Sequence, residues 1–169
     1  DVPTYTEQTG ANNPLNGEDV GWPSSPEFVD IDNDGDMDIF SGENTGTFKF
    51  YENTGNATTA AFTEQTGANN PLNGEDIGTL SFPAFVDIDN DGDMDMFSGD
   101  NNGGTFSYFE NTGNATTAAF AEQTGVNNPL NGFSLGALTT PTFIDIDNDG
   151  DMDMFSGEWN GTIQYYENT

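Results

Sequence analysis

The chain has 169 residues, enough for one domain with a real core, and its 30 acidic residues against one basic residue, Lys49, give a formal charge of −29. This charge excludes nucleic-acid binding, because nothing would neutralise phosphates, and it argues against docking on anionic lipid. Cysteine and histidine are missing, so we expect no enzyme, with a carboxylate-pair glycosidase as the remaining catalytic alternative.

The first ten residues, 1–10, contain a segment that returns later in the chain. Tyr-Thr-Glu-Gln-Thr-Gly at 5–10 matches Phe-Thr-Glu-Gln-Thr-Gly at 62–67. The later copy has the character of the fourth strand of a repeated unit. We therefore predict that residues 1–10 are an orphan fourth strand with no unit before it.

Three tandem repeats of about 57 residues cover the rest of the chain. Phe28, Phe85 and Phe143 occupy equivalent positions, and an insertion near Asn101 accounts for a one-residue difference in spacing. We interpret 1–169 as a single repeat domain. Its units are predicted at 27–67, 84–125 and 142–169, with connectors at 11–26, 68–83 and 126–141.

Each unit is predicted to contain four short strands, which lie at 27–31, 37–41, 46–52 and 61–65 in the first unit. β-branched and aromatic residues between Asn and Gly clusters favour strands, and no segment has helical apolar spacing. The third strand is apolar on both faces, which indicates a sheet packed between two neighbours. The fold class is therefore all-β, with propeller-type blades.

The third unit ends after its third strand, at Tyr166-Glu167-Asn168-Thr169. Residues 1–10 could supply the missing strand. Three blades leave little room for a closed ring within one chain, so the expected recipient is the third unit of another copy. Such a head-to-tail contact gives a ring or a filament. The alternative that the residues leave open is a fragment of a larger secreted propeller.

An aspartate loop joins the first two strands of every unit, at 30–38, 87–95 and 145–153. Five carboxylates so close together repel one another, and a hard divalent cation with oxygen ligands relieves this repulsion, so we predict about three calcium ions. Position twelve is Ser41 and the flanks are strand-like, which excludes an EF-hand. The predicted ligands are Asp30, Asp32, Asp34, Asp36, Asp38, Asp87, Asp89, Asp91, Asp93, Asp95, Asp145, Asp147, Asp149, Asp151 and Asp153.

Within the first loop, the side chains of Asp30, Asp32, Asp34 and Asp38 are the expected donors. Asp36 is expected to contribute its backbone carbonyl, and Gly35 permits the sharp turn.

The run Phe-Val-Asp-Ile-Asp-Asn-Asp-Gly-Asp-Met-Asp, followed by a glycine turn and Tyr-Glu-Asn-Thr-Gly, resembles the FG-GAP or VCBS repeat family, which includes the integrin α-chain repeats. The resemblance covers all three units. It implies a β-propeller blade with calcium in the loop between its first two strands. The activity of the family does not carry over, because its members include adhesins, lectins and accessory domains of enzymes.

The expected function is a calcium-stabilised extracellular structural or adhesive protein whose partner is another copy of itself. Calcium loops of modest affinity favour an extracellular setting. No apolar run approaches the roughly 20 residues of a membrane span and no signal peptide is present, so we expect no direct membrane insertion.

A sugar-binding, lectin-like propeller is the alternative function. Trp22 and Trp159 lie beside polar residues and could stack on a glycan, although a blade-packing role is equally open. Asn-x-Thr sequons at Asn56, Asn114 and Asn160 matter only in a host that glycosylates them. Glu52, Glu110 and Glu167 recur in all three units, which suggests a structural hydrogen-bonding role.

Overall fold

The computed structural model describes residues 2–101 and 103–169, and it is all-β apart from three single turns of 3₁₀ helix. Strands follow one another in chain order within each antiparallel sheet. Sheet 1 contains β1 (Ser25–Val29), β2 (Asp38–Gly42), β3 (Phe48–Asn53) and β4 (Phe62–Gln65). Sheet 2 contains β5 (Phe82–Val86), β6 (Asp95–Gly99), β7 (Phe106–Asn111) and β8 (Phe120–Gln123). Sheet 3 contains β9 (Thr140–Ile144), β10 (Asp153–Gly157) and β11 (Ile163–Tyr166).

The first strand of each unit lies two residues earlier than predicted. β1 ends at Val29, because the carboxylate of Asp30 accepts hydrogen bonds from the N–H groups of Asp34 and Gly35 and so belongs to the following loop. The predicted absence of long helices is correct. The sequence reading missed the 3₁₀ turns η1 (Gly10–Asn12), η2 (Gly67–Asn69) and η3 (Gly125–Asn127). Each begins at a glycine with positive φ.

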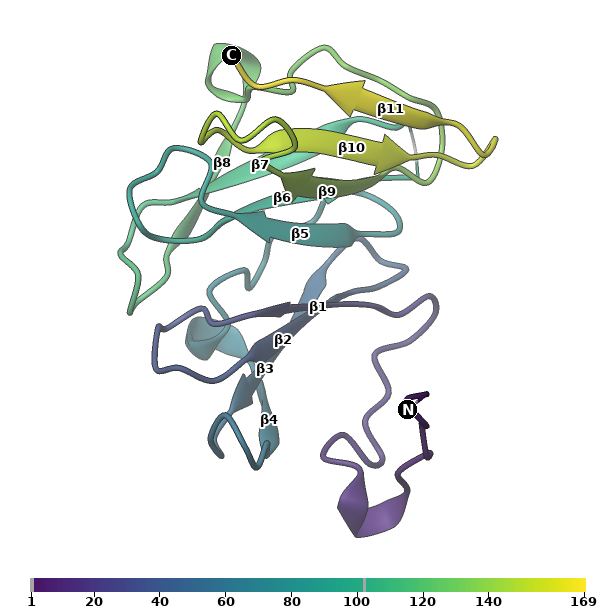
Figure 1. The fold of residues 1–169 in the computed structure, drawn as a ribbon, viewed down its shortest axis with the longest axis vertical. Coiled ribbons are helices and arrows are strands. Elements are labelled where there is room, and N and C mark those ends of the chain that lie inside the picture. The colour runs from purple at the N-terminus through teal and green to yellow at the C-terminus, as the bar shows by residue number, and fades with distance from the viewer. Residues whose placement is uncertain (1, 102) are drawn as a thin grey trace.

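The three sheets are stacked along the long axis of the molecule, and the first strands β1, β5 and β9 lie next to one another (Figure 1). We call the face of a sheet that points toward the next sheet its trailing face, and the opposite face its leading face. This arrangement is an open stack of blade-like sheets.

The core lies between the sheets. One apolar layer joins the trailing face of sheet 1 to the leading face of sheet 2, and a second layer joins sheets 2 and 3 in the same way. Phe40 of β2 stacks on Phe50 with ring centroids 4.4 Å apart and contacts Phe85 of the next sheet at 4.9 Å. Phe97 repeats both contacts with Tyr108 and Phe143, at 4.5 and 4.9 Å. The third strand of sheet 2 is thus apolar on both faces because each face has a neighbouring sheet.

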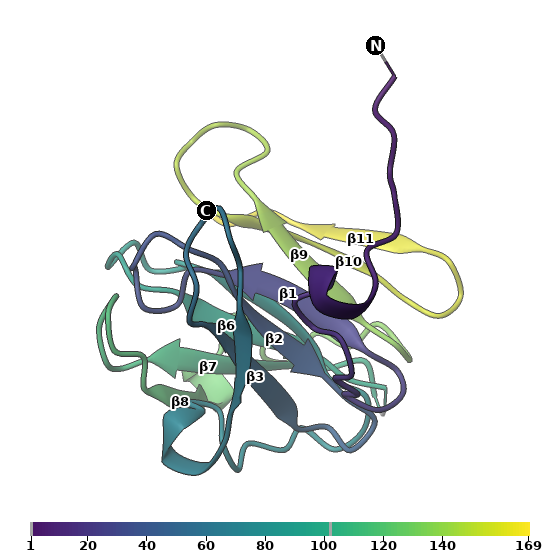
Figure 2. The ribbon, with the colours of Figure 1, turned by 90° about the horizontal axis from the view of Figure 1, so that it is seen from below.

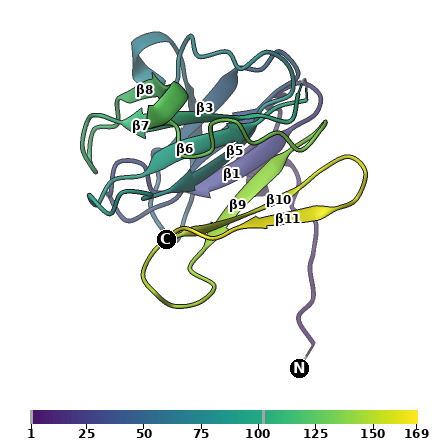
Figure 3. The same cartoon turned by 90° about the horizontal axis from the view of Figure 1, so that it is seen from above.

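The predicted orphan strand is not paired within one chain. Residues 2–9 form no strand, their side chains are exposed, and Asp1 lies outside the described residues. This arm projects away from the sheets (Figure 2 and Figure 3), and it lies toward the opposite end of the long axis from the C-terminus (Figure 1). Sheet 3 has three strands within the described chain.

Replacing Phe97, which is fully buried in the second layer, tests the layered core. Phe97→Ala should lower the free energy of unfolding by about 3–5 kcal/mol, because a large cavity opens between two sheets. Denaturant unfolding in calcium would measure the loss. Val126, fully exposed, is the control, and Val126→Ala should change stability by less than about 0.5 kcal/mol. Equal effects of the two changes would contradict the layered core.

Candidate metal centres

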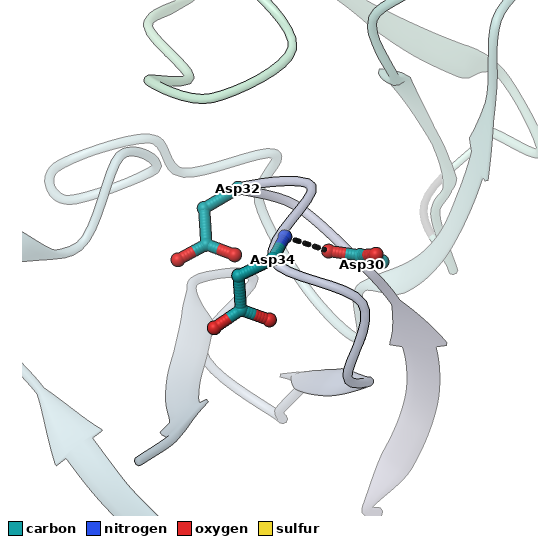
Figure 4. A group of neighbouring side chains, drawn as sticks. All are labelled: Asp30, Asp32 and Asp34. Carbon is teal, nitrogen blue, oxygen red and sulfur yellow. Dashed lines mark hydrogen bonds between the residues drawn. The ribbon is translucent and has the colours of Figure 1, made fainter. Parts of the chain in front are cut away.

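Each aspartate loop connects the first and second strands of its sheet, and hydrogen bonds within the loop fix its shape. In the first loop, Asp30 Oδ1 accepts the N–H of Asp34 at 3.1 Å (Figure 4). Asp30 Oδ2 accepts the N–H of Gly35 at 3.1 Å, and Asp34 Oδ1 accepts the N–H of Asp36 at 3.0 Å. Asn33 and Gly35 have φ values of 55° and 94°. Since few residues besides glycine tolerate the second value, Gly35 performs the predicted role in the turn.

The other two loops repeat this geometry. Asp87 accepts the N–H groups of Asp91 and Gly92 at 3.1 Å, and Asp145 accepts those of Asp149 and Gly150 at the same distance. The backbone therefore returns to one conformation in three different places.

These loops gather the carboxylates at positions one, three and five. In each loop the three side chains offer oxygen atoms within 4.8 Å of one another. Calcium binds oxygen at about 2.3–2.6 Å, so oxygens up to about 5 Å apart can share one ion. All the donors are hard oxygens, which suits calcium. The three clusters are Asp30, Asp32 and Asp34; Asp87, Asp89 and Asp91; and Asp145, Asp147 and Asp149.

The aspartate at position seven is buried, which the sequence reading did not anticipate. Asp36 and Asp93 are 6% and 7% exposed, and the Oδ1 atom of each has no hydrogen-bond partner among the described residues. Burial raises the pKa of each carboxyl, and the neighbouring aspartates raise it further. A buried carboxylate oxygen without a donor fits a site that is completed by a cation. Asp151 is half-buried at the same position of the third loop.

At position nine the aspartate ties the loop to the third strand of its sheet. Asp38 Oδ1 accepts the backbone N–H of Asn53 at 2.7 Å, and Asp95 and Asp153 accept those of Asn111 and Asn168 at 2.7 and 2.8 Å. These three aspartates lie outside the gathered clusters. Burial raises the pKa values of Asp38 and Asp95 to about 6.

The asparagine that follows the third strand is a partner of the loop that sequence reasoning treated only as a turn residue. Asn53 Oδ1 accepts the N–H groups of Gly55 and Ala61, at 3.1 and 2.9 Å, and so closes the β3–β4 hairpin. The signal was present in the recurring Glu-Asn-Thr-Gly. In the first unit Glu52 accepts a hydrogen bond from Gln65 at 2.6 Å.

Both tryptophans are exposed to solvent, at 76% each. The blade-packing alternative for Trp22 and Trp159 is therefore wrong within one chain. Trp22 lies in the connector before β1, and Trp159 lies in the turn between β10 and β11.

Comparison with known families agrees with the loop geometry. A family model for the FG-GAP-like repeat matches residues 30–98 and again residues 87–156. Each match begins at the first aspartate of a loop, and the two together include all three loops. No curated protein and no solved structure gave a significant match. Among the described residues, no helix has the length and apolar character needed to cross a membrane.

The raised pKa values predict opposite pH dependences with and without calcium. Burial raises the pKa of Asp38 and Asp95 from the ordinary aspartate value of 3.8 to about 6. Their stabilising contribution is therefore fully present below about pH 3.8 and is lost as pH rises through about 6. In excess chelator the melting temperature should rise when pH is lowered from 7.5 to 5.

In millimolar calcium the same change of pH should lower the melting temperature, because protons compete with the cation for carboxylates. Thermal melts at the two pH values in both buffers would test this. A melting temperature that moves in the same direction in both buffers would contradict the prediction.

Proposed function

Because the chain belongs to the FG-GAP-like repeat family, we propose that it is a calcium-stabilised structural or adhesive protein that works outside the cell. Its role is non-catalytic, and its surface and assembly carry its function. The observation that supports this proposal best is the threefold repetition of one carboxylate cluster at the same place in each sheet.

Calcium would be held by the gathered carboxylates of each loop, with the position-seven aspartate beside them. When bound, the ion supplies positive charge that offsets the repulsion between carboxylates. Three ions would remove six of the 29 formal negative charges. Since each loop joins two neighbouring strands, binding to the folded chain alone stabilises each sheet.

The expected size of this effect follows from mass action. At a calcium concentration about a hundred times the dissociation constant, one site stabilises the folded state by about 2.7 kcal/mol. Extracellular calcium at roughly millimolar levels would saturate sites of modest affinity. The extracellular location is proposed on this basis.

Calcium removal is the direct test. Excess chelator should lower the melting temperature by ten degrees or more, on the order expected when several kcal/mol are lost from a chain of this size. Isothermal titration should count about three ions. The double variant Asp30→Asn and Asp32→Asn should bind one ion fewer. Glu122→Gln removes one exposed charge outside the loops and should bind the full number. An unchanged melt in chelator would refute the proposal.

Glycan binding is a second candidate function, and the exposure of Trp22 and Trp159 favours it. Exposed indole rings stack on sugar faces, and neighbouring Asn and Asp side chains offer hydrogen bonds. A glycan array probed in calcium should then give binding that the Trp22→Ala and Trp159→Ala variants lose. No binding by the calcium-loaded chain would remove this candidate.

A further inference from the structure

The trailing face of sheet 3 exposes residues whose counterparts are buried in the other two sheets. Ile163 is 75% exposed, whereas its counterparts Phe48 and Phe106 are each 4% exposed. Ile144 is 48% exposed, against 4% for Val29 and 5% for Val86. Ile146 and Tyr165 are likewise exposed, unlike Ile31 and Phe50. This face therefore has the side chains of an interface layer with no sheet beside it in the described chain.

An aromatic triad shows what the face lacks. In the internal layers a stacked pair on the trailing face receives a third ring from the next sheet, Phe85 on Phe40 and Phe143 on Phe97, each at 4.9 Å. Sheet 3 has the stacked pair, Phe155 and Tyr165 at 4.7 Å. The counterpart of the third ring is Phe28, which is 58% exposed on the leading face of sheet 1. Sheet 3 thus has the stacked pair of the triad, and sheet 1 has the third ring.

Two glycines give independent evidence of a missing backbone neighbour. A methyl group on Gly46 would lie 2.7 Å from the backbone of Gly78, and one on Gly104 would collide with the backbone of Gly136. Their counterpart in sheet 3, Gly161, has nothing within 4 Å. The counterpart of Gly78 and Gly136 is Gly21, in the first connector.

The first connector also has a hydrogen-bond donor suited to this face. Asn70 and Asn128 donate their side-chain N–H to the carbonyls of Phe48 and Phe106 on the preceding sheet, at 2.9 and 2.8 Å. Asn13 has the same local turn, since its Oδ1 accepts the N–H of Leu15 at 3.0 Å. Its Nδ2 donates to no acceptor within the described residues. In sheet 3 the equivalent acceptor is the backbone carbonyl of Ile163.

The N-terminal arm has the strand and the side chain that sheet 3 lacks. Phe120 of β8 packs against Phe85 with ring centroids 6.1 Å apart. Its counterpart in the arm is Tyr5, which is 99% exposed. The corresponding place beside Phe143 is a cavity of about 430 Å³. Its lining includes Ile88, Leu130, Phe133, Phe143, Met154 and Tyr166.

We propose that a second copy of this chain docks head to tail on sheet 3 and reproduces the internal sheet-to-sheet interface. Its arm pairs with β11 and places Tyr5 in the cavity, while Phe28 completes the aromatic triad on Phe155. Closed propellers have about four to eight blades. Six is the multiple of three in that range, so the closed assembly contains two copies. The biological meaning of this dimer rests on the structural role proposed above. The contacts between the two copies do not require calcium.

The two tryptophans meet at this junction. Leu80 donates its N–H to the carbonyl of Asn44 across the internal layer, at 3.3 Å. The counterparts of these residues at the junction are Pro23, which has no N–H, and Trp159. Trp22 precedes Pro23, so the indoles of Trp22 and Trp159 lie at the point where this hydrogen bond is lost. Buried tryptophans are frequent anchors of interfaces.

Light scattering of the chain, which has a mass of 18.1 kDa, should give twice that mass. Tyr5→Asp and Ile163→Asp should each raise the dimer dissociation constant by about 30-fold or more, as expected for an interface anchor. Both residues are exposed in the single chain, so these variants should keep its fold. Thr116→Asp, at an exposed position in the β7–β8 turn of sheet 2, should remain dimeric. A monomeric chain at high concentration, or loss of the dimer in Thr116→Asp alone, would overturn the proposal.

Two further measurements identify the interface itself. On dilution into monomer, tryptophan emission should shift to longer wavelength, because both indoles become exposed. The chain has no cysteine, so Thr6→Cys in one chain and Glu167→Cys in another should cross-link, since Thr63 and Glu52 face each other in sheet 1. Mixing Thr6→Cys with Thr116→Cys should give no cross-link. Equal cross-linking of the two mixtures would overturn the proposed register.

The response of the melting temperature to calcium separates this inference from the proposed function. Monomeric Tyr5→Asp should still gain thermal stability from calcium if the loops bind the ion. A dimer without calcium stabilisation would refute the proposed function alone, and calcium stabilisation of a wild-type monomer would refute the head-to-tail dimer alone.

Discussion

A small sheet that is apolar on both faces cannot stand alone in water, and this constraint determines the architecture. β3 and β7 bury alternate residues on opposite sides. In β3, Phe48 and Phe50 face the next sheet, and Tyr51 is buried on the opposite face. The hydrophobic core therefore lies between sheets. Each sheet is stabilised by its neighbours more than by its own pairing, as expected for sheets of so few strands.

The connectors belong to this packing as much as the strands do. Leu72 and Leu130 are buried in the two layers, and each is held by an asparagine turn that also bonds to the preceding sheet. Gly46 and Gly104 allow the backbone of the next connector to approach closely. A connector thus fixes the distance between two sheets, and its sequence is constrained along most of its length.

The aspartate carboxylates lie outside the apolar layers between the sheets. The aspartate loops lie beyond the ends of the first strands, and their carboxylates are held by backbone N–H groups at fixed positions. These hydrogen bonds restrain the conformation that gathers the carboxylates, which lowers the conformational entropy that ion binding must overcome. Through Asp38 and its counterparts, the loop is also bonded to the third strand, so that occupancy of the loop bears on the whole sheet.

Much of this could be predicted from sequence. The order of the strands, the position of each loop and the family were predicted from alternation, turn residues and the aspartate motif, and the family match confirms the last. The burial of Asp36 and the bond from Asp38 to Asn53 could not be predicted, because they depend on how a loop folds back on a strand 15 residues away. The unpaired state of residues 2–9 follows from the absence of a neighbouring edge in a single chain.

The repetition of a single interface has a consequence for how the molecule comes apart. Sheets that contact only their nearest neighbours form a one-dimensional array, whose stability is a sum of unit and junction terms. In the single chain, sheet 2 has two junctions and the end sheets have one each. Local opening should therefore begin at β11 and in sheet 1, while β6 and β7 exchange their amide protons slowest. Ring closure would remove this gradient, because an array without ends has no weakest unit.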